Sequence, residues 1–184
     1  MSKQAAPAWW VLASIYCTLG WVFVHFYGRP FASVAHEDLA HEFAVPLLAI
    51  ASFVLSYEIF DCMGVGIVAI ANAHKFKDGK ISERFQTPVV DLPSDYVRAL
   101  RAQSNQIEQM PFFMAMLLGA VLFVDGVAVG MLGVVYCFTR ALYGRAYRAG
   151  GLTSALSAYT MPCYFMMGTV AGINVVGAIQ LLWQ

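Results

Sequence analysis

Five long apolar segments constrain the fold of this 184-residue chain more than any other feature. They cover Ala8–Tyr27, Leu39–Ala73, Tyr96–Val124, Val127–Tyr147 and Leu152–Trp183. Each is long enough for a helix of about 20 residues that crosses a bilayer. Strand-like alternation is absent, and in lipid only helices and closed barrels satisfy their backbone hydrogen bonds. The sequence therefore predicts an all-α integral membrane protein with several spans.

The composition supports a membrane protein, because 60% of the residues are hydrophobic and only 12% are charged. A soluble domain carries about twice that share of charge. The net charge is zero, so no nucleic-acid partner is expected. The cysteines lie singly within apolar segments, at Cys17, Cys62, Cys137 and Cys163. They are predicted to be buried free thiols, and no metal site is predicted.

The distribution of basic residues predicts the orientation in the membrane. With five spans, the N-terminus, the loop 74–95 and the turn 147–152 share one side of the bilayer. Of the eleven basic residues, only Arg29 lies on the other side. The basic side is therefore predicted to be cytoplasmic, and the first segment is interpreted as an uncleaved signal anchor. The sequence does not distinguish between the endoplasmic reticulum, another intracellular membrane and a bacterial inner membrane as the location.

A polar stripe interrupts the third segment. It consists of Arg98, Arg101, Asn105 and Glu108, whose spacing i, i+3, i+7, i+10 places them on one face of a helix. Ionisable groups within a bilayer are costly and by default indicate a functional site. Arginine, amide and carboxylate together suit a small zwitterion with carboxylate and ammonium groups. The alternatives are a structural polar network between helices and, for Arg98, contact with solvent or lipid phosphate.

Two motifs lie in separate predicted spans. The first reads R-A-Q-x-N-x-x-E-x-x-P from Arg101 to Pro111, and the second reads R-x-x-Y-x-x-x-Y from Arg140 to Tyr147. Together they resemble the MAPEG family, membrane-associated proteins in eicosanoid and glutathione metabolism, over roughly residues 41–183. The resemblance implies a four-helix membrane domain at 39–184, preceded by an extra transmembrane helix and connection at 1–38. It also implies a homotrimer that holds glutathione between neighbouring subunits.

The resemblance further implies a reaction, in which glutathione is conjugated to a lipophilic electrophile or reduces a lipid hydroperoxide that arrives from the bilayer. The implied contacts to glutathione, the co-substrate, are Arg101, Gln103, Asn105, Glu108, Arg140, Tyr143 and Tyr147. An arginine can hold a carboxylate in a bidentate fork, and Glu108 can accept from an ammonium group.

The chain departs from catalytic relatives after the second tyrosine. The resemblance implies that catalytic relatives have an arginine, usually followed by serine, just after this turn. Here Thr153 and Ser154 stand at those positions, and no basic residue follows Arg148. A thiol of pKa about 8.5 is mostly protonated at neutral pH without a nearby cation. Arg148, Ser154 and Tyr147 are the remaining catalytic candidates, although Arg148 is also interpreted as a solvated turn residue. The sequence leaves enzyme activity open; the alternative is a non-catalytic subunit of a larger membrane complex or a lipid-binding scaffold.

Two carboxylates lie within the second apolar segment, where charge is expensive. Glu58 and Asp61 are spaced i, i+3, which predicts that they share one face of a helix. We interpret them as members of an interhelix pair with Arg140 or with His25. A direct role toward substrate and a proton or ion path are the alternatives.

Overall fold

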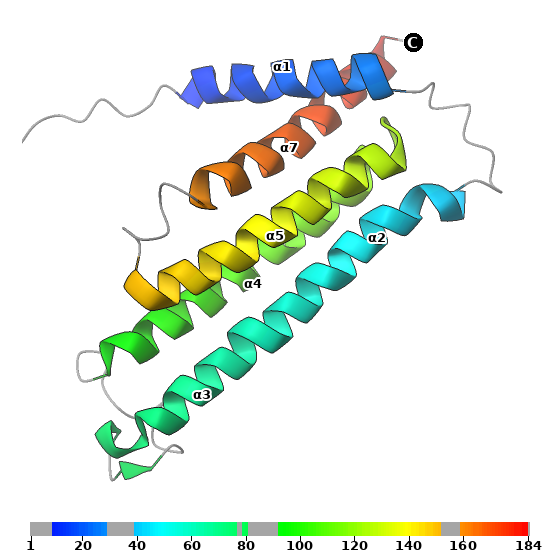
Figure 1. Cartoon of the computed structure of the whole chain (residues 1–184). Helices are drawn as coiled ribbons and strands as arrows, with labels where there is room; N and C mark the ends of the chain where they lie inside the picture. The colour runs from blue at the N-terminus through cyan, green and yellow to red at the C-terminus, as the bar shows by residue number, and fades with distance from the viewer. Residues whose placement is uncertain (1–8, 29–38, 77–78, 81–91, 152–158, 184) are drawn as a thin grey trace, which may run out of the picture. The chain divides into compact units, whose positions relative to one another are not determined.

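The computed structural model of the protein describes residues 9–28, 39–76, 79–80, 92–151 and 159–183 (Figure 1). The elements are α1 (Trp9–Tyr27), α2 (Leu39–Ser56), the π-helix η2 (Tyr57–Cys62), α3 (Met63–Ala71), the 3₁₀ turn η3 (Ala73–Lys75), α4 (Ser94–Ala120), α5 (Gly126–Gly150) and α7 (Met161–Leu182). Over these ranges every helix or strand assigned is a helix, which confirms the all-α prediction. Three helical stretches are long and apolar enough to cross a membrane: His41–Ala71, Gly126–Gly150 and Met161–Leu182.

Capping residues bound α5 at both ends. Asp125 caps the helix, because its Oδ1 accepts a hydrogen bond from the backbone N–H of Ala128 at 3.0 Å. At the other end Gly151 has φ +75°, the left-handed conformation that favours glycine, and its N–H donates to the Tyr147 carbonyl at 2.7 Å. The last apolar segment is helical as α7 from Met161, while residues 152–158 lie outside the described ranges.

A π turn separates α2 from α3 and changes which residues face inward. In η2 the backbone hydrogen bonds follow an i→i+5 pattern, so the turn holds more residues than an α-helical turn. The phase of the side chains shifts accordingly: Asp61 is buried at 5% exposure, whereas Glu58 is exposed. The prediction that the two carboxylates share a face is therefore wrong, because the i, i+3 rule assumes a regular α-helix.

The chain divides into two compact units. Unit 1 comprises Met1–Ile50, Phe112–Tyr136 and Pro162–Gln184, and unit 2 comprises Ala51–Pro111 and Cys137–Met161. The core of unit 1 is apolar, with Leu117, Val129 and Ile173 fully buried.

The extra helix α1 is packed tightly on α7 within unit 1. A Cβ atom on Gly20 would lie 2.1 Å from the carbonyl carbon of Gly172, and one on Gly172 would lie 2.0 Å from the carbonyl oxygen of Tyr16. Small residues at such positions let two helix backbones approach closely in a membrane. The end of α1 is also fixed, since the N–H of Asp125 donates to the Tyr27 carbonyl at 3.0 Å. Thus α1 is an integral part of unit 1.

Gly172→Val is expected to lower the free energy of unfolding by about 1–3 kcal/mol, because the added side chain overlaps the α1 backbone. Thermal unfolding in detergent measures the effect. Gly66→Ala is the matched control, since a Cβ there meets nothing within 4 Å and the substitution only improves helix propensity. A melting temperature for Gly172→Val equal to that of the wild type would contradict the packing.

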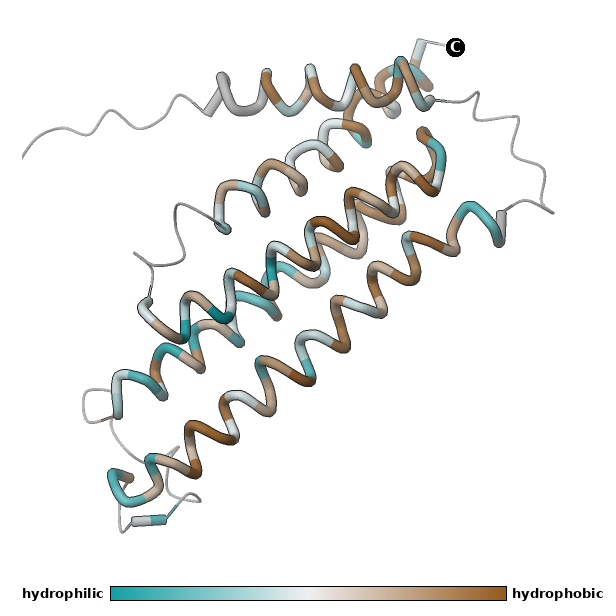
Figure 2. Tube along the Cα trace, viewed as in Figure 1, coloured by the Kyte–Doolittle hydropathy of each residue, from teal (hydrophilic) through white to brown (hydrophobic). Residues whose placement is uncertain are grey.

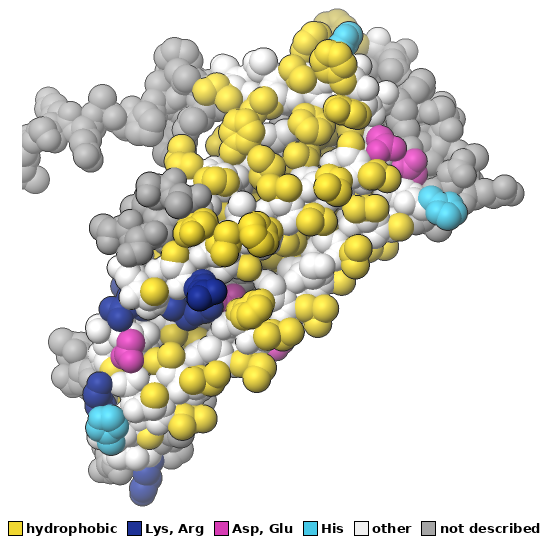
Figure 3. Space-filling view, in the orientation of Figure 1, with side chains coloured by type: hydrophobic (Ala, Val, Ile, Leu, Met, Phe, Trp, Pro, Cys, Tyr) yellow, Lys and Arg dark blue, Asp and Glu magenta, His cyan; other side chains and the backbone are white. Residues whose placement is uncertain are grey.

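Unit 2 carries the polar part of the described chain. Polar residues concentrate in the first half of α4 and the second half of α5 (Figure 2). Every described lysine and arginine lies in unit 2, amid hydrophobic side chains (Figure 3): Lys75, Lys80, Arg98, Arg101, Arg140, Arg145 and Arg148. At the start of α4 the buried Asn72 donates to Asp95 Oδ2 at 2.9 Å, which lowers the pKa of the Asp95 carboxyl. Unit 2 is therefore where a charged ligand would find partners.

Candidate functional site

The polar side chains of α4 lie on two different faces of the helix. Arg101 and Glu108 are exposed, whereas Gln103 is half-buried and Gln106 is buried. At about 100° per residue, positions 103 and 106 point roughly away from positions 101 and 108. The polar side chains of α4 thus divide into an outer pair, Arg101 and Glu108, and an inner pair, Gln103 and Gln106.

Asn105 joins α4 to α5. Its Nδ2 donates to the Tyr143 hydroxyl at 3.2 Å, and its backbone carbonyl accepts from Arg140 Nη2 at 2.6 Å. Tyr143 and Tyr147 are both buried, with ring centroids 5.7 Å apart, and they pack against the buried Ala102. The structure therefore brings Asn105, Arg140, Tyr143 and Tyr147 together within unit 2.

Arg140 is a buried cation, 7% exposed. Its Nε donates to Gln106 Oε1 at 2.8 Å, and its guanidinium carbon lies 4.6 Å from the centroid of the Tyr143 ring, a cation–π contact. No ion pair joins it to a carboxylate among the described residues. The positive charge is thus held by an amide, a carbonyl and an aromatic ring.

Gln106 is a site residue that sequence reasoning missed. It is 2% exposed, and its Nε2 has no hydrogen-bond partner among the described residues. A buried donor without a partner costs about 1–3 kcal/mol. The available signal was its spacing of three from Gln103, which puts a second amide on the inner face of α4.

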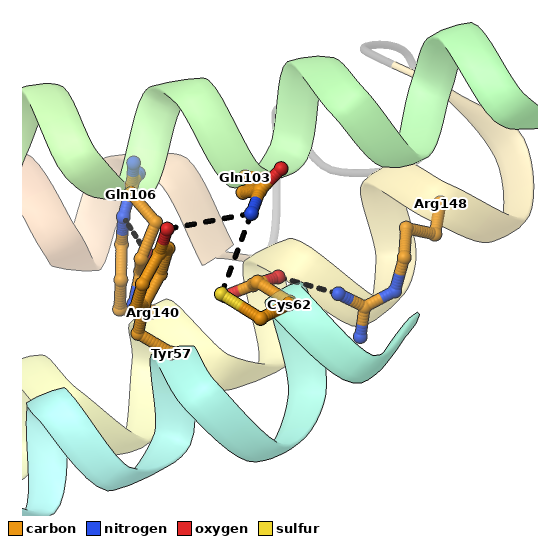
Figure 4. Close-up of polar contacts among 7 residues, drawn as sticks. Tyr57, Cys62, Gln103, Gln106, Arg140 and Arg148 are labelled. Carbon is orange, nitrogen blue, oxygen red and sulfur yellow. Dashed lines mark hydrogen bonds and ion pairs between the residues drawn. The ribbon is translucent and has the colours of Figure 1, made fainter. Parts of the chain in front are cut away.

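Gln103 contacts η2 instead of the outer pair. Its Nε2 lies 3.3 Å from the Tyr57 hydroxyl and 3.3 Å from Cys62 Sγ, and donates to both (Figure 4). Tyr57 and Cys62 are the first and last residues of the π turn. The π turn therefore presents a hydroxyl and a thiol to the same amide of α4.

The buried carboxylate of η2 pairs with the last arginine of the sequence. Arg148 Nη1 lies 2.5 Å from Asp61 Oδ1, and the side chains are 20% and 7% exposed. The predicted interhelix pair exists for Asp61, but its ion-pair partner is Arg148; Arg140, one of the predicted partners, acts on Asp61 only through its charge. The interpretation of Arg148 as a solvated turn residue is wrong, because its guanidinium forms an ion pair with Asp61. Thr153 and Ser154 lie outside the described residues.

The backbone of the same arginine holds α4. Arg98 Nε donates to the carbonyl oxygen of Arg148 at 3.2 Å. Arg148 thus links α5 to η2 through its side chain and to α4 through its main chain. Arg98 is half-buried and contributes to this link, so it is separate from the outer pair.

Gln106→Glu is expected to stabilise the protein by about 1 kcal/mol, because the unpartnered amide group is removed and Arg140 gains a charge-assisted hydrogen bond. Thermal unfolding at neutral pH measures the change. Gln103→Glu is the matched control on the same helix; it is expected to destabilise, because a carboxylate cannot donate to Tyr57 and Cys62. A lower melting temperature for Gln106→Glu would show that Arg140 needs no anionic partner.

Comparison with known protein families identifies the family of this chain. The sequence model described as the MAPEG family matches residues 43–174, which include both polar motifs and exclude α1. The chain therefore belongs to the MAPEG family. Comparison with curated proteins finds no match. Family membership supports a membrane protein with a glutathione- or eicosanoid-related function.

Proposed function

We propose that this protein binds glutathione along the outer face of α4, between Arg101 and Glu108. Both side chains are exposed, and neither pairs with another residue in the described part of the chain. Seven residues of helix span about 10 Å. An extended tripeptide also spans about 10 Å. Arg101 would hold a carboxylate at one end of the ligand, and Glu108 would accept from the ammonium group at the other.

Asn105 of α4 and the α5 residues Arg140, Tyr143 and Tyr147 would form the wall of this site. Asn105 is half-buried next to the outer pair and is fixed by Tyr143 and Arg140, so its position is rigid. Arg140, Tyr143 and Tyr147 would contact the ligand from α5. The proposed reaction is conjugation of glutathione to a lipophilic electrophile or reduction of a lipid hydroperoxide, with the thiol as nucleophile and the apolar substrate arriving from the bilayer.

A non-catalytic function is the second candidate, and the ion pair at Arg148 favours it. Arg148 is the last cation of the sequence, and Asp61 already neutralises its charge. A glutathione thiol would then lack the cation that favours the thiolate. In this reading the protein is a structural or accessory subunit of a membrane complex, or a lipid-binding scaffold.

We further propose that the chain forms a homotrimer, with the extra helix at 1–38 and the family domain at 39–184. The outer position of Arg101 and Glu108 supports a site that a neighbouring copy completes. With the basic side and the N-terminus in the cytoplasm, glutathione would reach the site from the cytosol.

Calorimetry of glutathione binding to the detergent-purified full chain tests the proposal. Arg101→Ala is expected to weaken binding about tenfold or more. A hydrogen bond to a charged group contributes about 1.5–3 kcal/mol, and a loss of about 1.4 kcal/mol lowers the affinity tenfold. Ser104→Ala, an exposed residue of the same helix, is the matched control and should bind like the wild type. Absence of binding in the wild type would contradict the proposal.

The ultraviolet absorbance of the thiolate, read on the same samples, separates the two candidates. Thiolate at neutral pH in the bound complex is expected of a transferase or peroxidase. Binding without thiolate is expected of the non-catalytic member.

A further inference from the structure

Glu58 is a carboxylate without a partner in the middle of an apolar helix face. Its exposed neighbours on η2 and the adjoining turns are Leu55, Ile59 and Met63, at 59%, 52% and 60% exposure. It lies 17 residues from one end of the span His41–Ala71 and 13 from the other. Among the described residues none forms a hydrogen bond or ion pair with it.

Such a carboxylate cannot rest against lipid without a large penalty. A charged group near the middle of a membrane helix costs about 2.5–3.5 kcal/mol even by the more permissive scales, and it is normally paired or faces protein. Asp61, one turn away, forms an ion pair with Arg148, so Arg148 is not available to neutralise Glu58. No cation among the described residues of this copy pairs with Glu58, which leaves its carboxylate available to a partner on another copy.

Arg145 is an exposed cation at a depth near that of Glu58. It is exposed on α5, and no hydrogen bond or ion pair joins it to another described residue. A Cβ atom on Gly144 would lie 3.3 Å from Asp61 Oδ1, so those two positions share a level in the bundle. Glu58 is three residues from Asp61 and Arg145 is one from Gly144, which together amount to about 6 Å along the helix axes. The long arginine side chain can cover that offset.

We infer that Glu58 of one copy forms an ion pair with Arg145 of a second copy, and that the apolar face around Glu58 is the docking surface between them. A symmetry axis along the membrane normal keeps each residue at the same depth in every copy, so charges of similar depth within one chain are also at similar depth in neighbouring copies. In the proposed trimer the contact is head-to-tail, with Glu58 of each copy facing Arg145 of the next, and three such contacts close the ring. This inference rests on the proposed homotrimer and names its contact.

Crosslinking tests the pair directly. The full chain with Glu58→Cys and Arg145→Cys is treated in lipid nanodiscs with a short bifunctional thiol reagent. Glu58→Cys alone and Arg145→Cys alone are the matched controls, since both keep the native cysteines. Covalent dimers and trimers on a denaturing gel are expected from the double variant only. Products confined to one chain, or equal in a single variant, would overturn the inference.

Charge reversal gives an independent readout. Glu58→Arg is expected to reduce the association constant at least about tenfold in native mass spectrometry, and adding Arg145→Glu is expected to restore it. If Glu58→Arg assembles as strongly as the wild type, the ion pair is overturned while the trimer stands. If the wild type is monomeric in every condition, the trimer and the ion pair both fall, whatever the calorimetry of glutathione shows.

Discussion

Asp61→Ala is expected to lower the free energy of unfolding by about 3–5 kcal/mol, because it leaves the guanidinium of Arg148 without its buried partner. The carboxylate is 7% exposed, so water replaces little of the lost interaction. The link from Arg98 to the Arg148 carbonyl would loosen as well, since both contacts fix the last turn of α5. Unfolding in mixed detergent micelles, followed by helical circular dichroism, measures the change.

A double variant separates the ion pair from simple packing. Replacing both Asp61 and Arg148 with leucine removes the charges together, and such paired replacements are often neutral or stabilising. The double variant should therefore recover most of the stability lost in Asp61→Ala. If Asp61→Ala unfolds like the wild type, the pair contributes nothing and its place in the fold needs another explanation.

Thr153→Arg is expected to raise the thiolate fraction of bound glutathione about eightfold or more at neutral pH. A free thiol has a pKa of about 8.5, and a neighbouring cation lowers it by one or more units. The family resemblance implies that Thr153 stands where catalytic relatives have an arginine, and Arg148 is paired with Asp61. Thiolate absorbance in the glutathione complex measures the change, and the rate of conjugation to a lipophilic electrophile should rise with it.

Thr153→Gln is the matched control, because it adds length and hydrogen bonding without charge. It should leave the thiolate fraction at the wild-type value. A strong thiolate signal in the wild type that Thr153→Arg does not increase would show that another group already supplies the cation. Arg140 would then be the candidate, since it is the buried arginine that lacks a carboxylate among the described residues.

The sequence predicted the elements well, because hydropathy and turn residues are local properties. The apolar segments appear as helices over the described residues, and α4 contains the polar stripe in full. The two motifs also predicted the family, which the match over residues 43–174 confirms. The role of the outer pair, Arg101 and Glu108, stays a prediction that glutathione binding will test.

Local patterns along the chain are therefore sufficient to predict the class of protein, its helices and its family. The tertiary structure alone decided which polar groups meet. The π turn places the Asp61 side chain in the interior and leaves the Glu58 side chain exposed. No local sequence pattern predicts an i→i+5 turn. The pairing of Asp61 with Arg148, 87 residues away, and of Gln106 with Arg140 depends on how separate helices pack. Spacing along one helix reports which residues share a face, whereas the partner across the bundle is fixed by long-range packing.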